Sequence, residues 1–141
     1  MLLVLLLTLA TAQMGFDQDK TVHHFYLYKD GGAIVVAAKD AKDADATKEQ
    51  VRAHLSHIAT MFGNGNFEAP MLVHDTTNVP GIAVLAERRA AVTYRYAETS
   101  GGGRVDVMTT DPAALTALHD FLRYQIREHA TGDPRSVTRR R

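Results

Sequence analysis

Two stretches of the chain repeat the same order of predicted elements, and this repetition constrains the fold more than any other feature of the sequence. The first stretch, residues 22–62, predicts a strand at 22–28, a turn at 30–32, a strand at 33–38 and a helix at about 47–62. The second stretch, residues 92–129, predicts a strand at 92–97, a turn at 101–103, a strand at 104–109 and a helix at 113–129.

Both turns are rich in glycine, which permits the positive φ angles of tight hairpin turns. Two hairpins that each lead into a helix predict an α+β fold. We expect a duplicated β-β-α unit that forms a four-stranded, mainly antiparallel sheet with two helices on one face. At 141 residues, the chain is long enough for one such domain with a modest core.

The two predicted helices each carry a stripe of apolar residues at helical spacing. The stripes consist of Val51, Leu55, Ile58 and Phe62 in the first helix and of Leu115, Leu118, Leu122 and Ile126 in the second. We expect these side chains to be buried against alternating strand residues, namely Phe25, Ile34, Val36, Tyr94, Val105 and Val107. Asp111 followed by Pro112 predicts the start of the second helix.

The remaining parts of the sequence leave more than one interpretation open. Residues 66–79 form a loose connection, and residues 82–89 fit either a short helix or a strand. The outer face of the sheet is partly apolar, and its predicted members are His24, Tyr26, Tyr28, Val35, Arg95 and Asp106. Such a face fits either a homodimer interface or a surface that is covered by the middle segment, which connects the two repeated units.

The N-terminus resembles a secretory signal peptide. Residues 2–9 are apolar except for Thr8, and Ala10-Thr11-Ala12 supplies the small residues that a signal peptidase needs before Gln13. The apolar run is too short to span a bilayer, so we expect residues 1–12 to be removed and the mature chain to have no membrane span. No Lys or Arg precedes the leucines, and the alternative is a buried apolar strand or helix.

We therefore expect an exported protein, periplasmic or extracellular, with a single domain at residues 13–134 and a disordered basic tail at residues 135–141. The chain has 16 basic and 16 acidic residues, and this balance argues against nucleic acid as a partner. It has no cysteine, which excludes disulfides, thiolate metal ligands and haem attached through cysteine.

The seven histidines are the strongest candidates for a site. His54, His57 and Met61 are spaced by three and four residues, which places them on one flank of the first helix. His119 and His129 fall within the buried stripe of the second helix, and His23 is expected on the strand face that points toward the helices. Imidazole suits copper, zinc or haem iron, and a thioether favours copper(I).

The metal hypothesis therefore places one ion between His54, His57, Met61, His119 and His23. The alternative is that these histidines only pack and form hydrogen bonds, because a His-x-x-His pair without an embedded acid is a weak motif. His23 and His24 are adjacent in a strand, face opposite ways and cannot enter one site.

Enzyme signatures are weak in this sequence, and we leave enzymatic activity open. None of Ser56, Ser100 and Ser136 lies in a Gly-x-Ser-x-Gly elbow. The dipeptides His74-Asp75 and His119-Asp120 do not by themselves set the geometry of a proton relay. The glycines at 101–103 lie between two strands, whereas a phosphate loop leads into a helix.

Several stretches together resemble a family of small, secreted bacterial proteins. They are residues 15–21 with His23-His24-Phe25, and residues 51–59, 69–71, 103–105 and 119–126. The resemblance extends from residue 15 to about residue 134, and some members carry the label aspartate carbamoyltransferase. The Ser-Thr-Arg-Thr helix start with which that transferase binds carbamoyl phosphate is missing here, so no catalytic residue carries over. The resemblance implies export and a compact α+β domain.

Three functions follow in order of preference. The first is an exported protein that binds a metal ion or a haem-like ligand through histidines without turnover. The second is an interaction module that forms a dimer or docks a partner with its sheet face. The third is an uncharacterised hydrolase or transferase.

Overall fold

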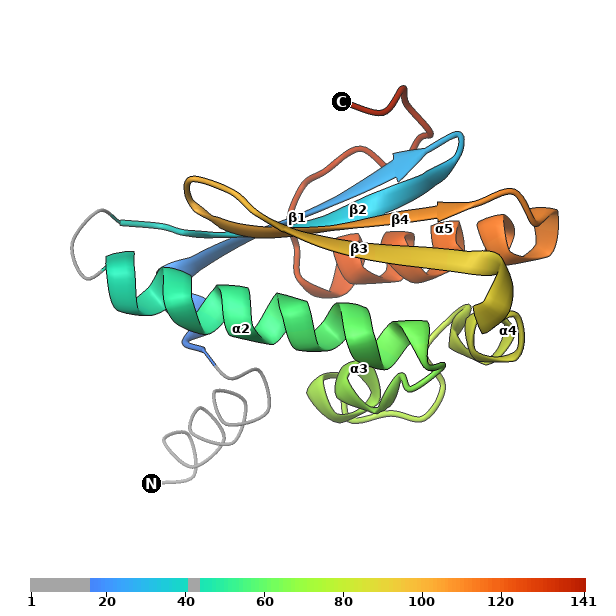
Figure 1. Cartoon of the computed structure of the whole chain (residues 1–141), viewed down its shortest axis with the longest axis horizontal. Helices are drawn as coiled ribbons and strands as arrows, with labels where there is room; N and C mark the ends of the chain where they lie inside the picture. Colours follow the sequence, from blue (N-terminus) through green and yellow to red (C-terminus); the bar gives the residue numbers. More distant parts are fainter. Residues whose placement is uncertain (1–15, 41–43) are drawn as a thin grey trace.

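The structure is a computed structural model that describes residues 16–40 and 44–141. Its centre is a four-stranded antiparallel sheet with the strand order β1-β2-β4-β3 (Figure 1). The strands are β1 (Thr21–Tyr28), β2 (Gly31–Ala38), β3 (Val92–Glu98) and β4 (Gly102–Thr109). The predicted signal peptide lies outside the described residues.

The helices lie on one face of this sheet (Figure 1). They are α2 (Ala44–Gly63), α3 (Glu68–Val73), α4 (Ile82–Glu87) and α5 (Pro112–Glu128), with short 3₁₀ turns η1 (Gln18–Lys20) and η2 (Arg89–Ala91). The predicted α+β class and the duplicated β-β-α arrangement are confirmed. The helix of each unit packs mainly on the hairpin of the other unit. Helix α2 of the first unit contacts mainly β3 and β4, and helix α5 of the second unit contacts mainly β1 and β2.

In the first hairpin, the glycines lie in the strand and not in the turn where they were predicted. The turn contains only Lys29 and Asp30, and both glycines already belong to β2. Gly31 has a φ of +153°, and a Cβ atom there would lie 1.8 Å from the carbonyl oxygen of Val107. Glycine at this position therefore lets the central strands β2 and β4 approach each other.

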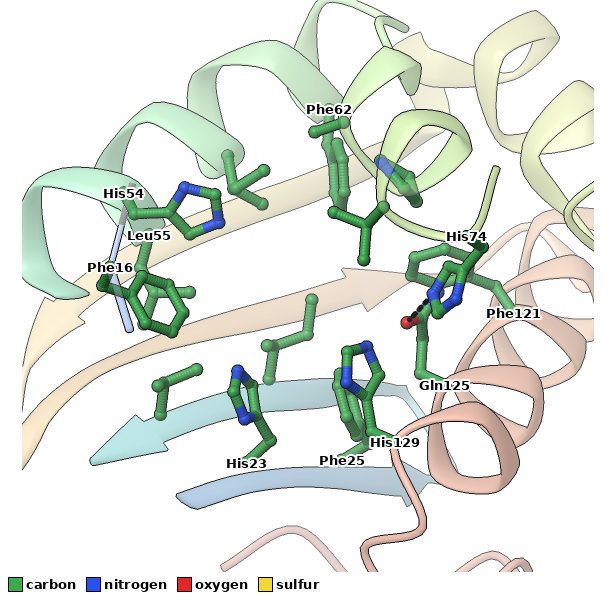
Figure 2. A pocket seen from close by; sticks show the side chains of 16 residues that line it. Phe16, His23, Phe25, His54, Leu55, Phe62, His74, Phe121, Gln125 and His129 are labelled. Carbon is green, nitrogen blue, oxygen red and sulfur yellow. Dashed lines mark hydrogen bonds between the residues drawn. The ribbon is translucent and has the colours of Figure 1, made fainter. Parts of the chain in front are cut away.

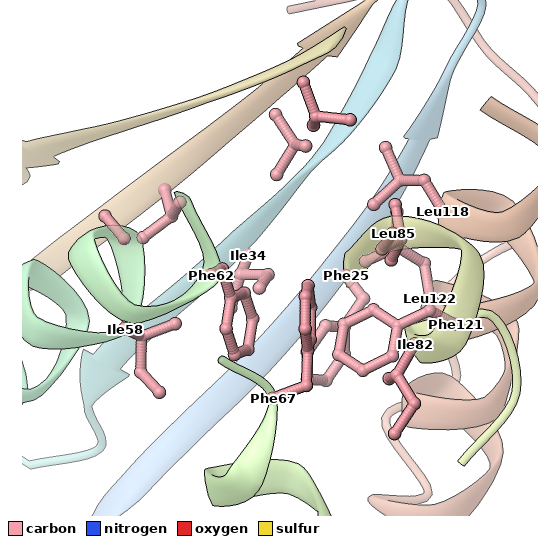
Figure 3. Packing of buried hydrophobic residues seen from close by; sticks show 14 of the residues in the cluster. Phe25, Ile34, Ile58, Phe62, Phe67, Ile82, Leu85, Leu118, Phe121 and Leu122 are labelled. Carbon is pink, nitrogen blue, oxygen red and sulfur yellow. The ribbon is translucent and has the colours of Figure 1, made fainter. Parts of the chain in front are cut away.

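The core between sheet and helices contains the predicted apolar stripes. Val51, Leu55, Leu118 and Leu122 are almost completely buried. Leu115 is only partly buried, because the stripe of α5 runs through smaller and aromatic neighbours instead, namely Ala114, Ala117 and Phe121. Three aromatic rings meet at the centre of Figure 3: Phe62 of α2 and Phe67 before α3 stack with centroids 4.4 Å apart, and Phe121 of α5 meets both of them edge-on. Asp111 caps α5 by accepting hydrogen bonds from the backbone N–H groups of Ala113 and Ala114.

The middle segment lies on the helix side of the sheet and not on its outer face. Residues 82–87 form the short helix α4, which packs against α5. Gly81 begins this helix with a φ of +83°, and a Cβ atom there would lie 2.0 Å from the carbonyl oxygen of Ala117. Of the two alternatives for the outer face, cover by the middle segment does not match the structure, because apolar residues of this segment pack against α2 and α5.

The C-terminal residues cover part of the outer face instead. Thr138 forms a parallel bridge with Tyr28 at the edge of β1. Arg140 donates hydrogen bonds to the carboxylates of Asp30 and Asp106 and lies over the ring of Tyr28. The tail was expected to be disordered, whereas in the structure Arg140 contacts two carboxylates and an aromatic ring. None of the helices in the described part of the chain is long and apolar enough to cross a bilayer.

Candidate functional site

A pocket of about 70 Å³ lies between the sheet and the helices α2, α3 and α5. Strands β1 and β2 form its floor, and α2, the α3 region and the C-terminal end of α5 form its walls (Figure 2). We call it the histidine pocket. It is lined by Phe16, His23, Phe25, Ile34, Val36, His54, Leu55, Ile58, Phe62, Ala69, Pro70, Val73, His74, Phe121, Gln125 and His129.

Four of the seven histidines line this pocket, and each comes from a different part of the fold (Figure 2). His23 belongs to β1 and His54 to α2, while His74 follows α3 and His129 follows α5. The rings of His23 and His129 stack with centroids 5.2 Å apart, and His74 meets the edge of His129 at the same separation. The pocket thus contains a contiguous row of three imidazoles.

Phe16 separates the fourth histidine from this row. Its ring centroid lies 5.7 Å from that of His23 and 5.2 Å from that of His54. Its side chain is 1% exposed, although it lies near the start of the described residues. Phe16 is therefore part of the pocket wall, and His54 reaches the pocket from the far side of this ring.

Burial in the pocket keeps the imidazoles of His23, His54 and His129 neutral at pH 7. Burial lowers the pKa of His23 to about 4, and repulsion from the neighbouring His129 and His54 adds to the effect. Burial also lowers the pKa of His54 and of His129 to about 4, with smaller contributions from His57 and from His74 respectively. No Asp, Glu, Lys or Arg is among the described lining residues.

Two polar atoms in the pocket wall have no hydrogen-bond partner among the described residues. The Oε1 atom of Gln125 accepts a hydrogen bond of 2.9 Å from Nε2 of His74, as the dashed line in Figure 2 marks. The Nε2 atom of the same Gln125 amide is buried without a partner, and so is Nε2 of His23. Buried polar groups in native proteins are almost always paired, so these two atoms indicate a place for a bound molecule or water.

The predicted metal ligands occupy several separate places. His54 and His23 line the pocket, whereas the side chain of His57 is exposed and Met61 packs partly buried against the core. His119 is buried elsewhere, and its Nε2 atom lies 2.9 and 3.0 Å from the carbonyl oxygens of Tyr28 and Gly31. It donates its proton to these oxygens.

The structure therefore does not assemble the five predicted residues around one point. The described residues contain no group of three or more His, Cys, Asp or Glu side chains that could hold a metal ion. His119 also lacks the neighbouring carboxylate that a proton relay needs, because the carboxylate of Asp120 is exposed and lies 3.7 Å from Arg123.

Sequence reasoning missed several residues of the pocket. His129 was expected to point inward, but it was not assigned to the site. His74 and Ala69 come from the connection at residues 66–79, where no periodicity marks an inward face. Gln125 lies on the buried side of α5, and a polar residue between Leu122 and Ile126 on an apolar stripe is the signal that could have identified it.

No family model, curated protein or solved structure matches the chain.

Proposed function

We propose that the protein binds a small, uncharged organic molecule in the histidine pocket. The observation that carries this proposal is a pocket wall of aromatic rings and imidazoles, in which burial keeps His23 and His129 neutral and no Asp, Glu, Lys or Arg is among the described lining residues. Binding sites for small molecules are concave and mostly apolar, with a few polar groups that orient the ligand. Many enzymes have a deep polar cleft with paired acids and bases, and this pocket is of a different kind.

The size of the pocket limits the ligand. Its volume is about 70 Å³, whereas an apolar cavity of about 150 Å³ holds one benzene molecule in another protein. The histidine pocket therefore encloses part of a small ring or of a short branched chain, or the apolar end of a larger molecule, and the rest of the ligand lies at its open mouth. Haem is far larger than this space, so the haem part of the sequence hypothesis is poorly supported by the pocket.

Titration with small cyclic probes, followed by amide and side-chain NMR signals, tests this proposal. We expect cyclopentane or cyclopentanone to shift the signals of pocket residues such as Phe16, His129 and Phe121, and to leave those of α4 unchanged. Ala69→Leu should abolish these shifts by filling the pocket, because Ala69 lines it. Ala83→Leu is the matched control, because Ala83 is an exposed residue of a short helix. Absence of pocket shifts with both probes would contradict the proposed function.

A metal ion is the second candidate, and the adjacent rings of His23, His129 and His74 favour it. Neutral imidazole is the form that coordinates a metal, and burial keeps His23 and His129 in this form. Coordination requires the rings to turn toward a common point. Calorimetric titration with zinc and copper(II) on tag-free protein distinguishes this candidate, since one strong site lost in His129→Ala would support it.

We also propose that the protein is exported and that residues 1–12 are removed. Cleavage before Gln13 would leave Phe16 in the mature chain, and Phe16 is a wall of the pocket. The intact mass of protein isolated from its native host measures this directly. A mass that still includes residues 1–12 would contradict the proposal.

A further inference from the structure

We infer that the molecule bound in the histidine pocket is neutral and carries a carbonyl oxygen that accepts a hydrogen bond from the side-chain amide of Gln125. This inference rests on the proposed function and names the chemical class of the ligand. It comes from two features of the pocket. Two buried polar atoms of its wall lack a hydrogen-bond partner, and no Asp, Glu, Lys or Arg is among its described lining residues.

Gln125 defines the polar group of the ligand. Its side chain is 4% exposed and faces the pocket from α5 (Figure 2). His74 already occupies Oε1 of this amide, so the group that lacks a partner is Nε2, which only donates. The missing partner is therefore an acceptor, and a carbonyl oxygen is the common acceptor of an uncharged organic molecule.

The His74 ring contacts the oxygen end of the Gln125 amide. Nε2 of His74 carries the proton in this arrangement, because Oε1 of Gln125 only accepts, and the opposite orientation of the amide would require His74 to carry its proton on Nδ1 instead. The edge of the His74 ring also packs against Tyr124 at a centroid separation of 5.0 Å, which restricts its movement. The unpaired N–H groups of Gln125 are thus held in place before a ligand arrives.

His23 provides the second polar position, at the other end of the imidazole row. Its Nε2 atom is buried without a partner, and a neutral imidazole nitrogen either donates or accepts, depending on its tautomer. A ligand with a second polar group, such as a hydroxyl, would satisfy both positions, whereas a simple ketone satisfies only Gln125. The aromatic and aliphatic side chains between these positions receive the apolar body of the ligand.

Displacement of water should increase the preference of the pocket for a ketone over a hydrocarbon. A polar site that exceeds about 10–15 Å³ accommodates a water molecule, so water satisfies the two unpaired atoms in the free protein. A ligand that displaces this water and offers no acceptor loses its hydrogen bonds. A hydrocarbon should therefore bind less tightly than a ketone of the same shape.

The uncharged wall determines the response to an anion. A carboxylate would enter a space without a cationic side chain, where burial holds the pKa of His23 and His129 far below 7. Burying an unpaired charge is strongly unfavourable. A carboxylate with the same ring should therefore bind least of all.

Three probes with one ring test this inference at pH 7 by NMR titration: cyclopentanone, cyclopentane and cyclopentanecarboxylate. We expect cyclopentanone to bind about fivefold tighter than cyclopentane, the effect of one hydrogen bond, and the carboxylate to bind too weakly to measure. Gln125→Met should remove the advantage of the ketone and retain binding of cyclopentane. Gln50→Met is the control for the same substitution at an exposed position of α2.

The outcomes separate the inference from the proposed function. Equal binding of ketone and hydrocarbon, or tightest binding of the carboxylate, would overturn the inference and leave a small-molecule pocket. Failure of all three probes to shift pocket signals would overturn the proposed function itself. The ranking of the probes on the unmodified protein decides the matter even where Gln125→Met fails to fold.

Discussion

The two halves of helix α5 show how one amphipathic helix builds both a closed core and an open pocket. In the first half, Ala114, Ala117 and Leu118 pack against the sheet and α4 and are almost fully buried. Near the other end, Gln125 and the residue after the helix, His129, line the histidine pocket. The same periodicity thus continues along the helix while the packing partner changes.

The two histidines on this helix face repeat the contrast. His119 is 8% exposed, and its Nε2 proton is shared by two carbonyl oxygens from the β1–β2 hairpin. The half-buried His129 lies against other rings, those of His23, His74 and Phe25. The hydrogen-bond partners therefore distinguish the structural histidine from the one that lines the pocket.

The largest expected effect concerns the closed half of α5. Leu118→Ala should reduce the free energy of unfolding by roughly 2–5 kcal/mol, because a truncated core leucine loses transfer energy and leaves a cavity. Urea denaturation measures this loss. The matched substitution His129→Ala should cost less than about 1 kcal/mol, because its ring borders an open pocket. Equal losses would mean that the two halves are packed alike.

The second prediction compares the histidines themselves. His119→Ala should reduce the free energy of unfolding by about 1–3 kcal/mol, since two buried carbonyl oxygens lose their donor. His23→Leu should be neutral or stabilising, because it replaces a buried nitrogen without a partner by an apolar group. Denaturation curves of both variants at pH 7 provide the test. A larger loss for His23→Leu than for His119→Ala would contradict the assignment of roles.

The fold was largely predictable because it depends on local patterns. Strand alternation, glycine-rich hairpins and the leucine stripes are readable within windows of a few residues, and they predicted the sheet and both long helices. The errors concern contacts between distant segments. The residues around Arg140 do not indicate that it binds Asp30 and Asp106, since these partners lie 110 and 34 residues away from it in the sequence.

The candidate site was only partly predictable for the same reason. Periodicity correctly placed His23 and His54 on inward or flanking positions, and both line the pocket. It treated His54 and His57 as equivalent, although the first faces the pocket and the second faces solvent. His119 also matched the pattern of an inward ligand, but it donates its hydrogen bonds to the carbonyl oxygens of Tyr28 and Gly31, which lie 91 and 88 positions earlier in the sequence.

The third prediction uses pH to measure how deeply the pocket is buried. The folded-state pKa of His23, His54 and His129 is about 4, below the value of 6.5 for an exposed histidine. Between these values the unfolded chain binds more protons than the folded chain, so stability falls as pH drops from 6.5 toward 4. We expect a loss of about 1 kcal/mol per histidine between pH 7 and pH 5, after allowing for water that reaches the open pocket.

Denaturation midpoints at a series of pH values test this prediction. His23→Leu should flatten the decline, because one proton-binding site disappears from the unfolded chain. His57→Leu serves as the exposed control on α2. An unchanged stability from pH 7 to pH 5 would show that the imidazoles are not excluded from water.

The smallest expected effects separate the two histidines that the sequence made equivalent. His57→Ala should change the free energy of unfolding by less than about 0.5 kcal/mol, as for most exposed surface positions. It should also leave cyclopentanone affinity and any zinc or copper affinity unchanged, because its side chain lies outside the pocket.

His54→Ala removes an imidazole that packs against Phe16, so it should weaken cyclopentanone binding by a few-fold through a looser wall. NMR and calorimetric titrations of the two variants in parallel measure these differences. Loss of metal binding in His57→Ala would restore the ligand set first predicted for α2 and would move the functional site from the pocket to the flank of that helix.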